Sequence, residues 1–543
     1  MIDDKIKKWL HIKTFFLQKN EYPKILDDNA EKWFCLGVPI VISLFVKLIL
    51  LSTLYQSTIN MDGILYINAA RQYAAGNIAN GLALYPMPGY PLLIALFHIL
   101  IPDWIFAGYM ISIMSMVLAI IPLYYLTKYM FGMRAAFWAS LIFAILPKMN
   151  EWSLYVSRDP LFLFIFAWCI YFAIISIRSI QKTDFVLFWI TLVLAWSAML
   201  IRIEAIIFIF FYFGTLIYFA FTNKEQRSHY FLKSLIWAGI PLCISITTFF
   251  ILGSHGVAVN RLDQVFSELI NFLNGNFLDL YSQIYQFFKE AENHPPFSGL
   301  HYNFAALSRH YLLIIYILGI TGVLIKVIFP LSCIPLYIAL KEKLTSQGKF
   351  ILSIWIVYIG LVYYFLLTRD FLSTRFLMIP AFLLLPWIGS GIDKLCRKIN
   401  NSSHKKLILF LILALILVPA VKSFELIFFN DNATPCAVKW LAENNMLQKK
   451  QIATNNKKLS FYIDLEDEKG TVDRTIHYYN NLKNYTGIEK FALKNNADIL
   501  LINLHTKNKK KIPDFRFFKK IHTMSGDIDL VQIYYRDNDH EVQ

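Results

Sequence analysis

The sequence predicts a polytopic α-helical membrane protein of about eleven transmembrane helices with a small C-terminal soluble α/β domain. Three observations predict this fold class: a high apolar fraction, repeated long apolar runs, and a sharp change to polar composition near residue 430. Hydrophobic residues make up 57% of the 543 residues and charged residues only 16%, with a mean hydropathy of +0.49. A soluble chain of this length would have to split into several cores to bury so much apolar surface, whereas lipid accepts it directly.

The apolar runs give the expected spans, because crossing a bilayer takes roughly 20 mostly apolar residues. Two runs are ambiguous. The run at 310–340 is too long for one simple span, so it is tilted, broken or two segments, and Leu92–Ile101 is too short to span and reads as interfacial or re-entrant. The expected spans are 35–55, 104–126, 134–148, 160–177, 184–200, 203–222, 234–252, 310–340, 350–368, 376–393 and 405–429.

The connecting loops set the expected orientation. Most of their Lys and Arg residues fall on one side, which the positive-inside rule assigns to the cytoplasm. The N-terminus is then cytoplasmic, and the long loops 57–103 and 253–309 and the tail are extracytoplasmic. We expect a multi-pass protein of the inner (plasma) membrane, with a transmembrane domain at 1–430 and a periplasmic domain at 431–543.

The tail alternates short apolar runs with helical segments, which predicts a small α/β domain. Expected strands lie at 451–454, 497–504 and 529–535, and expected helices at 436–445 and 487–493. In the first outer loop, an amphipathic helix is expected at 63–75, stopped by Gly76. The second outer loop carries expected helices near 264–273 and 278–292.

Composition excludes several functional classes. The net charge of +15 fits cytoplasmic loops held against anionic lipid, and no basic patch lies on a soluble fold, so no nucleic-acid partner is expected. No Cys or His spacing is typical of a metal site, and no glycine-rich nucleotide motif is present. The sequence predicts no cofactor and no metal site, and leaves a divalent metal as an open alternative.

Two acidic residues begin expected outer helices. Asp62, in Asn60-Met61-Asp62-Gly63, reads as a helix N-cap or as a general base that takes a proton from an attacking hydroxyl. Asp159, in Arg158-Asp159-Pro160, reads first as a cap followed by proline at the first helical position. Arg158 beside it is a cation at the lipid boundary that can meet a phosphate.

Two further cationic positions lie near the same face. Arg202 and Glu204 separate two apolar runs and form either a short outer turn or a charged pair that faces a cavity or partner. Arg375 begins an expected span, where it either snorkels to the interface or clamps an anionic headgroup.

Asp62-x-x-x-Tyr66 followed by Tyr85-Pro86-x-Pro88-Gly89-Tyr90-Pro91 resembles the first outer loop of polytopic GT-C glycosyltransferases. The similarity is to the protein O-mannosyltransferase-like and aminoarabinose transferases of glycosyltransferase family 39. Arg158-Asp159-Pro160, Arg202 with Glu204, and Arg375 ahead of Pro380 are also similar to that family. Met87 departs from it, since many members have a second adjacent proline there, and the loop at 253–309 has no counterpart that we can align.

The resemblance implies an inverting transfer of a sugar from a polyprenyl-phosphate donor outside the cytoplasm. It implies that Asp62 is the catalytic base and that Asp159, which matches the family's second loop acid, is also a catalytic residue. Arg158, Arg202 and Arg375 would bind the donor phosphate, and Tyr66, Tyr85, Pro88 and Tyr90 would form the substrate loop. The partners would be this donor, membrane lipids, and a lipid, glycan or protein acceptor. Two alternatives remain at this stage: a flippase of lipid-linked glycans, which often has two similar halves, and a non-catalytic membrane scaffold with a binding tail.

Overall fold

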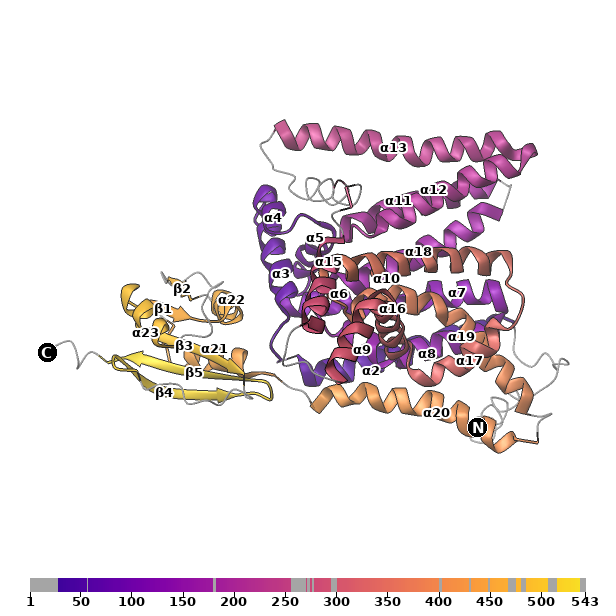
Figure 1. Cartoon of the computed structure of the whole chain (residues 1–543). Helices are drawn as coiled ribbons and strands as arrows, with labels where there is room; N and C mark the ends of the chain where they lie inside the picture. Colours follow the sequence, from indigo (N-terminus) through magenta and orange to yellow (C-terminus); the bar gives the residue numbers. More distant parts are fainter. Residues whose placement is uncertain are drawn as a thin grey trace, which may run out of the picture. The chain divides into compact units, whose positions relative to one another are not determined.

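The computed structural model (Figure 1) describes residues 28–55, 57–178, 182–254, 270, 274–275, 278–293, 300–399, 403–428, 431–447, 450–466, 475–479, 485–505 and 515–537. In the outer loop 253–309, residues 255–269, 271–273, 276–277 and 294–299 lie outside the described residues, and with them all but one residue of the helix expected near 264–273. The chain divides into two compact units. One contains residues up to Lys47 and Asn68–Ser423, and the other contains Leu48–Ile67 and Phe424–Gln543. Residues 48–67 therefore group with the tail, which the expected boundary at 430/431 does not anticipate.

The first unit is a bundle of long apolar helices, as expected. Eight helical stretches found among the described residues are long and apolar enough to cross a membrane: Trp33–Leu54, Trp104–Phe131, Arg158–Ile177, Ala205–Thr222, Asn303–Ile328, Ser346–Arg369, Thr374–Lys398 and Lys405–Glu443. The last of them runs over residues 429–430, which the structure does not describe. Shorter apolar helices occupy Gly89–His98, Met133–Ile145, Phe185–Ile201 and Pro330–Leu340. The polytopic helical fold is confirmed, and the count of eleven spans stays a prediction.

The helices of the chain before the tail have the following bounds: α2 (Asp28–Leu54), α3 (Met61–Ala74), α4 (Ile78–Leu84), α5 (Gly89–His98), α6 (Trp104–Leu118), α7 (Ile120–Phe131), α8 (Met133–Ile145), α9 (Pro147–Ser153), α10 (Arg158–Arg178), α11 (Lys182–Ile201), α12 (Ala205–Thr222), η1 (Lys224–Gln226), α13 (Arg227–Ser254), α15 (Asp279–Asn293), α16 (Leu300–Ile328), η3 (Pro330–Ser332), α17 (Cys333–Leu340), α18 (Ser346–Arg369), η4 (Thr374–Leu377), α19 (Met378–Lys398), α20 (Lys405–Phe424) and η6 (Glu425–Phe428). In the bundle, α10 packs on α11, α8 on α7 and α19, and α12 on α13 (Figure 1).

Several helix ends follow directly from local sequence. The run 310–340 is two helices, because α16 ends at Ile328 and η3 precedes α17. α8 stops before Pro147, which has no backbone N–H to continue it and takes the first position of α9. Gly76 has φ +77. Its N–H donates to the Tyr73 carbonyl and the N–H of Asn77 to that of Gln72, the hydrogen bonds of a Schellman motif, so the expected stop of α3 is confirmed.

Glycines allow α19 to approach two neighbours closely. A Cβ on Gly389 would lie 2.3 Å from the Ala135 carbonyl oxygen of α8, and a Cβ on Gly391 would lie 1.9 Å from the Pro335 carbonyl oxygen of α17. Since lipid supplies no hydrophobic force between helices, such small residues let backbones pack by van der Waals contact. α19 is buried along almost its whole length.

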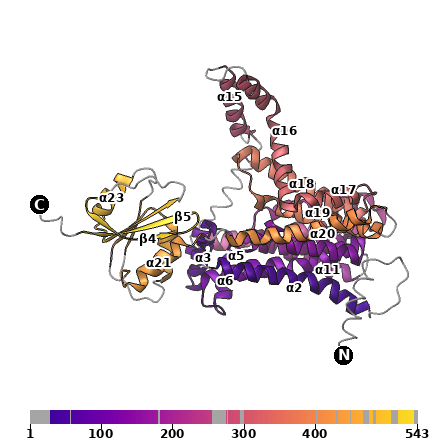
Figure 2. The ribbon, with the colours of Figure 1, turned by 90° about the horizontal axis from the view of Figure 1, so that it is seen from below.

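The tail folds as an α/β domain around one five-stranded sheet in the order β2-β1-β3-β5-β4. β1, β2 and β3 are parallel, while β5 pairs antiparallel with β3 and β4. Figure 2 shows α21 and α23 on opposite sides of the sheet, and each side has its own apolar core. The predicted strands and helices of the tail are confirmed within the usual boundary shifts. The bounds are α21 (Ala433–Glu443), β1 (Ile452–Thr454), α22 (Lys457–Glu466), β2 (Ile476–Tyr478), α23 (Tyr485–Lys494), β3 (Ile499–His505), β4 (Phe518–Ser525) and β5 (Asp529–Arg536).

Candidate active site

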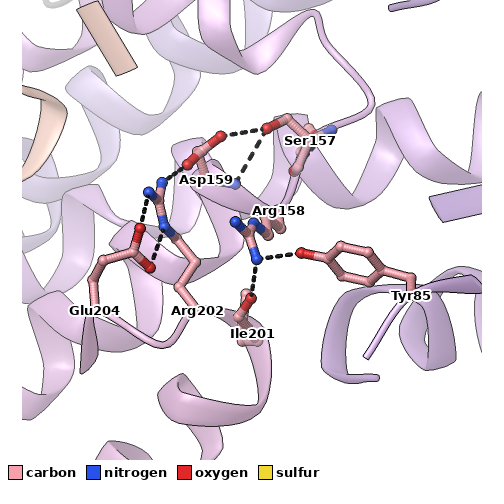
Figure 3. Close-up of polar contacts among 8 residues, drawn as sticks. Tyr85, Ser157, Arg158, Asp159, Ile201, Arg202 and Glu204 are labelled. Carbon is pink, nitrogen blue, oxygen red and sulfur yellow. Dashed lines mark hydrogen bonds and ion pairs between the residues drawn. The ribbon is translucent and has the colours of Figure 1, made fainter. Parts of the chain in front are cut away.

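A buried ionic cluster joins the start of α10 to the turn between α11 and α12 (Figure 3). Arg202 binds Glu204 in a bidentate manner, with Nε donating to Oε2 at 3.1 Å and Nη2 to Oε1 at 2.6 Å. Its Nη1 pairs with the Asp159 carboxylate. The side chains are only 5–8% exposed. Ionised groups this deep are costly unless paired. Arg202 and Glu204 lie in the short turn that the sequence allowed, and within this turn they form a buried charged pair.

The cluster sets the charge state of Glu204, which lies between two apolar helices. Burial alone raises the pKa of this carboxyl. The charge and hydrogen bonds of Arg202, with a smaller effect from Arg158, outweigh burial and lower the pKa from 4.5 to about 2. Glu204 is therefore ionised at every physiological pH.

Asp159 is paired rather than serving as the helix cap. α10 begins at Arg158, two residues before Pro160, the expected first helical residue, and Ser157 precedes it. The Ser157 hydroxyl donates to Asp159 Oδ2 at 2.7 Å and accepts from the Asp159 backbone N–H at 3.3 Å. The simple reading of Asp159 as an N-cap is thus corrected, because its carboxylate is held by Arg202 and Ser157.

Arg158 points to a different set of partners. Its Nη1 donates to the Tyr85 hydroxyl and to the Ile201 carbonyl, the latter at 3.3 Å, and its guanidinium lies 5.5 Å from the Tyr85 ring centroid. Both hydrogen bonds use Nη1, so Nη2 and Nε keep capacity for a further acceptor. Arg158 is half-buried, and it is the cation of this region with the most freedom to bind an anion.

The proline-rich run of the first loop packs against the same elements. Pro88 precedes α5. A Cβ on Gly89 would lie 2.9 Å from Ile201 Cγ1, so only glycine fits beside the end of α11. The hydroxyl of the fully buried Tyr90 donates to the Gly108 carbonyl at 3.1 Å and lies 3.2 Å from the Ser112 hydroxyl. Ser112 in turn donates to the Ser157 carbonyl at 3.2 Å, so this run reaches the start of α10 through a chain of hydrogen bonds.

Arg375 lies on a separate element, η4, which precedes α19. Its guanidinium lies 5.2 Å from the Phe376 ring centroid. The neighbouring Thr374 accepts a hydrogen bond from the indole of Trp152, which lies on α9, at 3.1 Å. Arg375 is half-buried, as an interfacial arginine would be.

Asp62 and Tyr66 belong to the second compact unit. Asp62 lies in the first turn of α3 and is half-buried, and Tyr66, one turn later, is 3% exposed. Asn60 precedes the helix, and its carbonyl accepts the Ile64 N–H at 3.2 Å. Asp62 therefore lies within the first turn of the helix rather than at the residue that precedes it.

Sequence reasoning missed a second buried polar network in the bundle. Lys47 on α2 is 0% exposed and donates to the Ser43 hydroxyl at 2.8 Å and to Asn150 Oδ1 at 2.7 Å. The Asn150 amide donates to the Ser423 hydroxyl on α20 at 3.0 Å. The available signal was the lysine inside an otherwise apolar span, because an intramembrane ionisable residue calls for a partner.

The described residues contain no group of three or more His, Cys, Asp or Glu side chains placed to hold a metal ion. The ionic cluster instead balances its carboxylates with arginine.

Comparison with known proteins supports the architecture. Residues 86–251 match the family model of dolichyl-phosphate-mannose-protein mannosyltransferases, which is less than half of the chain. No curated protein sequence matches. The fold is similar to the crystal structure of ArnT from Cupriavidus metallidurans bound to undecaprenyl phosphate, with 11% identity, a TM-score of 0.52, and coverage of 92% of this chain and 97% of that one. It is also similar to the Archaeoglobus fulgidus oligosaccharyltransferase in complex with Zn and sulfate, with 12% identity, a TM-score of 0.52, and coverage of 86% and 68%.

At these identities the solved structures show a shared fold, and the family match covers the outer loop from Pro86 together with α10, Arg202 and Glu204. The expected fold is confirmed: the chain has the multi-pass helical fold of these GT-C glycosyltransferases, and its residues 86–251 match the mannosyltransferase family model.

Proposed function

We propose that this protein transfers a sugar from a polyprenyl-phosphate donor to an acceptor hydroxyl, with inversion at the anomeric carbon. The observation that carries the proposal is the match of residues 86–251 to a family named for a dolichyl-phosphate-linked mannose donor. The bound undecaprenyl phosphate of the ArnT structure supports the same donor chemistry. The donor is therefore a sugar joined through phosphate to a long isoprenoid chain, and the acceptor is a lipid, a glycan or a protein.

The proposed reaction is a single displacement. The acceptor oxygen attacks the anomeric carbon, the bond from that carbon to the phosphate oxygen breaks, and the acceptor proton passes to the Asp62 carboxylate. The leaving polyprenyl phosphate takes the electron pair of the broken bond and gains negative charge. Cations near that oxygen lower the barrier because they stabilise the charge as it develops.

The geometry supports different roles for the three arginines first expected to bind phosphate. Arg158 keeps free donor capacity beside Tyr85, and it is the best candidate for the phosphate, with Arg375 as a second cation. Arg202 has both edges of its guanidinium occupied by carboxylates, so a phosphate would have to displace one of them. We assign positioning roles to Arg202 and Asp159, because their ion pair fixes the start of α10, which carries Arg158, relative to the end of α11.

The proposed orientation follows the charge of the loops, with a cytoplasmic N-terminus and an extracytoplasmic tail. Asp62, the run Tyr85–Tyr90, Arg158 and Arg375 then belong to outer segments. The carrier lipid would bring its phosphate to headgroup level on that side.

The test uses the full chain reconstituted in liposomes, with synthetic polyprenyl phosphates that carry a hexose or a pentose and a cell-envelope extract as acceptor. Mass spectrometry follows the release of polyprenyl phosphate and the glycosylated product. Asp62→Asn should lower turnover at least about 100-fold, since it removes the proton acceptor. Asp103→Asn is the matched control, because Asp103 caps α6 through Oδ1 and an amide oxygen can still cap.

Full activity of Asp62→Asn would contradict the assignment of the base. Movement of intact donor across the bilayer without a new glycosidic bond would contradict the transferase and favour the flippase.

A further inference from the structure

The segment just before the candidate base is held by the C-terminal domain. Residues 57–60 have no regular secondary structure, so their backbone groups need partners from elsewhere. The Thr58 N–H donates to the Asp431 carbonyl at 2.6 Å. The Ile59 N–H donates to the Tyr462 hydroxyl at 2.9 Å, and that hydroxyl lies 3.5 Å from the Ser57 carbonyl oxygen. Three consecutive residues are thus tied to the tail.

The two tail residues that make these contacts are themselves fixed. Tyr462 lies on α22 and packs against the apolar core between α21, α22 and the sheet. The side chain of Asp431 accepts the Asp529 N–H at 3.2 Å, which ties it to the start of β5. A mobile tail could not offer such anchors, whereas one built on a five-stranded sheet can.

The position of residues 57–60 determines the position of Asp62 through direct packing. Ile59 is 1% exposed. A Cβ on Gly63 would lie 2.9 Å from Ile59 Cδ1 and 2.9 Å from Asn60 Oδ1. The first turn of α3, which carries Asp62, therefore rests directly on Ile59 and Asn60, with a glycine at the closest point. Displacing Ile59 by a few tenths of an ångström displaces the start of this helix.

We infer that the C-terminal domain positions the candidate base, with Tyr462 as the positioning residue that fixes Ile59 and through it Asp62. This inference rests on the proposed role of Asp62. It gives the tail a part in the chemical step, in place of a role only as a platform for the acceptor.

The decisive variant is Tyr462→Phe, which removes one oxygen and keeps the ring in its apolar packing. Without the hydroxyl, the Ile59 N–H loses its acceptor, and the loss of one such hydrogen bond corresponds to about a tenfold change in rate when it acts on the transition state. We expect kcat to fall about tenfold while the KM values for donor and acceptor stay within about twofold. The matched control is Tyr534→Phe, because the Tyr534 hydroxyl donates to Gln532 on the same strand of the tail. It should leave kcat within about twofold.

Asp62→Asn, measured in parallel, tests the role of Asp62 as the base separately from the role of Tyr462 in positioning it. If Asp62→Asn is fully active, the assignment of the base fails whatever Tyr462→Phe does. If Asp62→Asn is inactive and Tyr462→Phe behaves like Tyr534→Phe, the positioning inference is overturned and the assignment of the base stands. A rise in acceptor KM with unchanged kcat would also overturn it, since that result describes an acceptor platform.

Discussion

Replacing Arg202 by methionine should destabilise the protein in a pH-dependent way. The substitution keeps the apolar stem but leaves the carboxylates of Glu204 and Asp159 buried without their cation. The Glu204 pKa is lowered from 4.5 to about 2 in the folded protein. At 1.36 kcal/mol for each pKa unit, this preference for the ionised form is worth about 3 kcal/mol. Removing one partner of a buried ion pair typically costs ~3–5 kcal/mol, which agrees in size.

The sign of the pH effect follows from the same pKa. In the wild type, a lowered pKa gives Glu204 a stabilising contribution that is present above pH 4.5 and is lost as the pH falls toward 2. In Arg202→Met, burial acts without its opposing charge, so the pKa rises above 4.5. The folded protein then prefers the protonated carboxyl, and the penalty for ionising it grows as the pH rises. The difference between the two proteins should be smallest near pH 4 and largest near pH 8.

The assay is the midpoint of thermal inactivation in nanodiscs at a fixed heating rate, since unfolding of such a protein is governed by rate. We expect a fall of about 5 °C or more at pH 7.5 and a clearly smaller fall at pH 4.5. Arg158→Met is the control, because its described hydrogen bonds are to a hydroxyl and a carbonyl, and it should shift the midpoint less at both pH values. Arg202→Met with Glu204→Gln should recover part of the loss at pH 7.5. An equal shift at both pH values, or none, would refute the charged form of this cluster.

Three further outcomes are expected. Gly391→Ala should lower the thermal midpoint by an amount equivalent to about 1–3 kcal/mol, because its Cβ would overlap a carbonyl of α17, while Gly360→Ala, with open space around it, should be neutral. Lys47→Met should destabilise the bundle by about 1–3 kcal/mol because it removes a buried hydrogen bond to Asn150, and Lys47→Met with Asn150→Leu should be less destabilised than the single variant. Tyr85→Phe should raise the donor KM several-fold with little change in kcat, as measured by titration of the donor, if the Tyr85 hydroxyl only orients an arginine that binds the donor in both ground and transition states.

The fold was predictable because its main signals are local. Long apolar runs fix where the bundle helices lie, and Pro147 and Gly76 end helices through their own backbone restrictions. The tail strands were predictable for the same reason, since β3 and β5 are short apolar runs bounded by polar residues. The span count was harder, because it depends on how broken helices such as α6 and α7, or α16 and α17, are joined.

The sequence allowed us to predict which residues belong to the candidate site, but not which of their side chains form ion pairs. Arg202 and Glu204 are two residues apart, so their contact is visible in the sequence, whereas Asp159 reaches them only when α10 packs on α11. The link from the tail to residues 57–59 was not predictable either. It uses backbone groups and one tyrosine hydroxyl more than 400 residues away in the chain. Neither kind of group produces a recognisable sequence pattern.

The pairing of charges decides which cation remains for substrate. Asp159, Glu204 and Arg202 together carry one net negative charge, and the nearby Arg158 restores neutrality without an ion pair of its own among the described contacts. A phosphate that bound Arg202 would have to break a bidentate pair and leave a carboxylate buried, which costs several kcal/mol. A phosphate that bound Arg158 would use donor groups that are still available and would leave the cluster intact. The cluster therefore works best as a fixed support that holds Arg158. This predicts that variants of Arg202 act mainly on stability, and that variants of Arg158 act mainly on the binding and turnover of the donor.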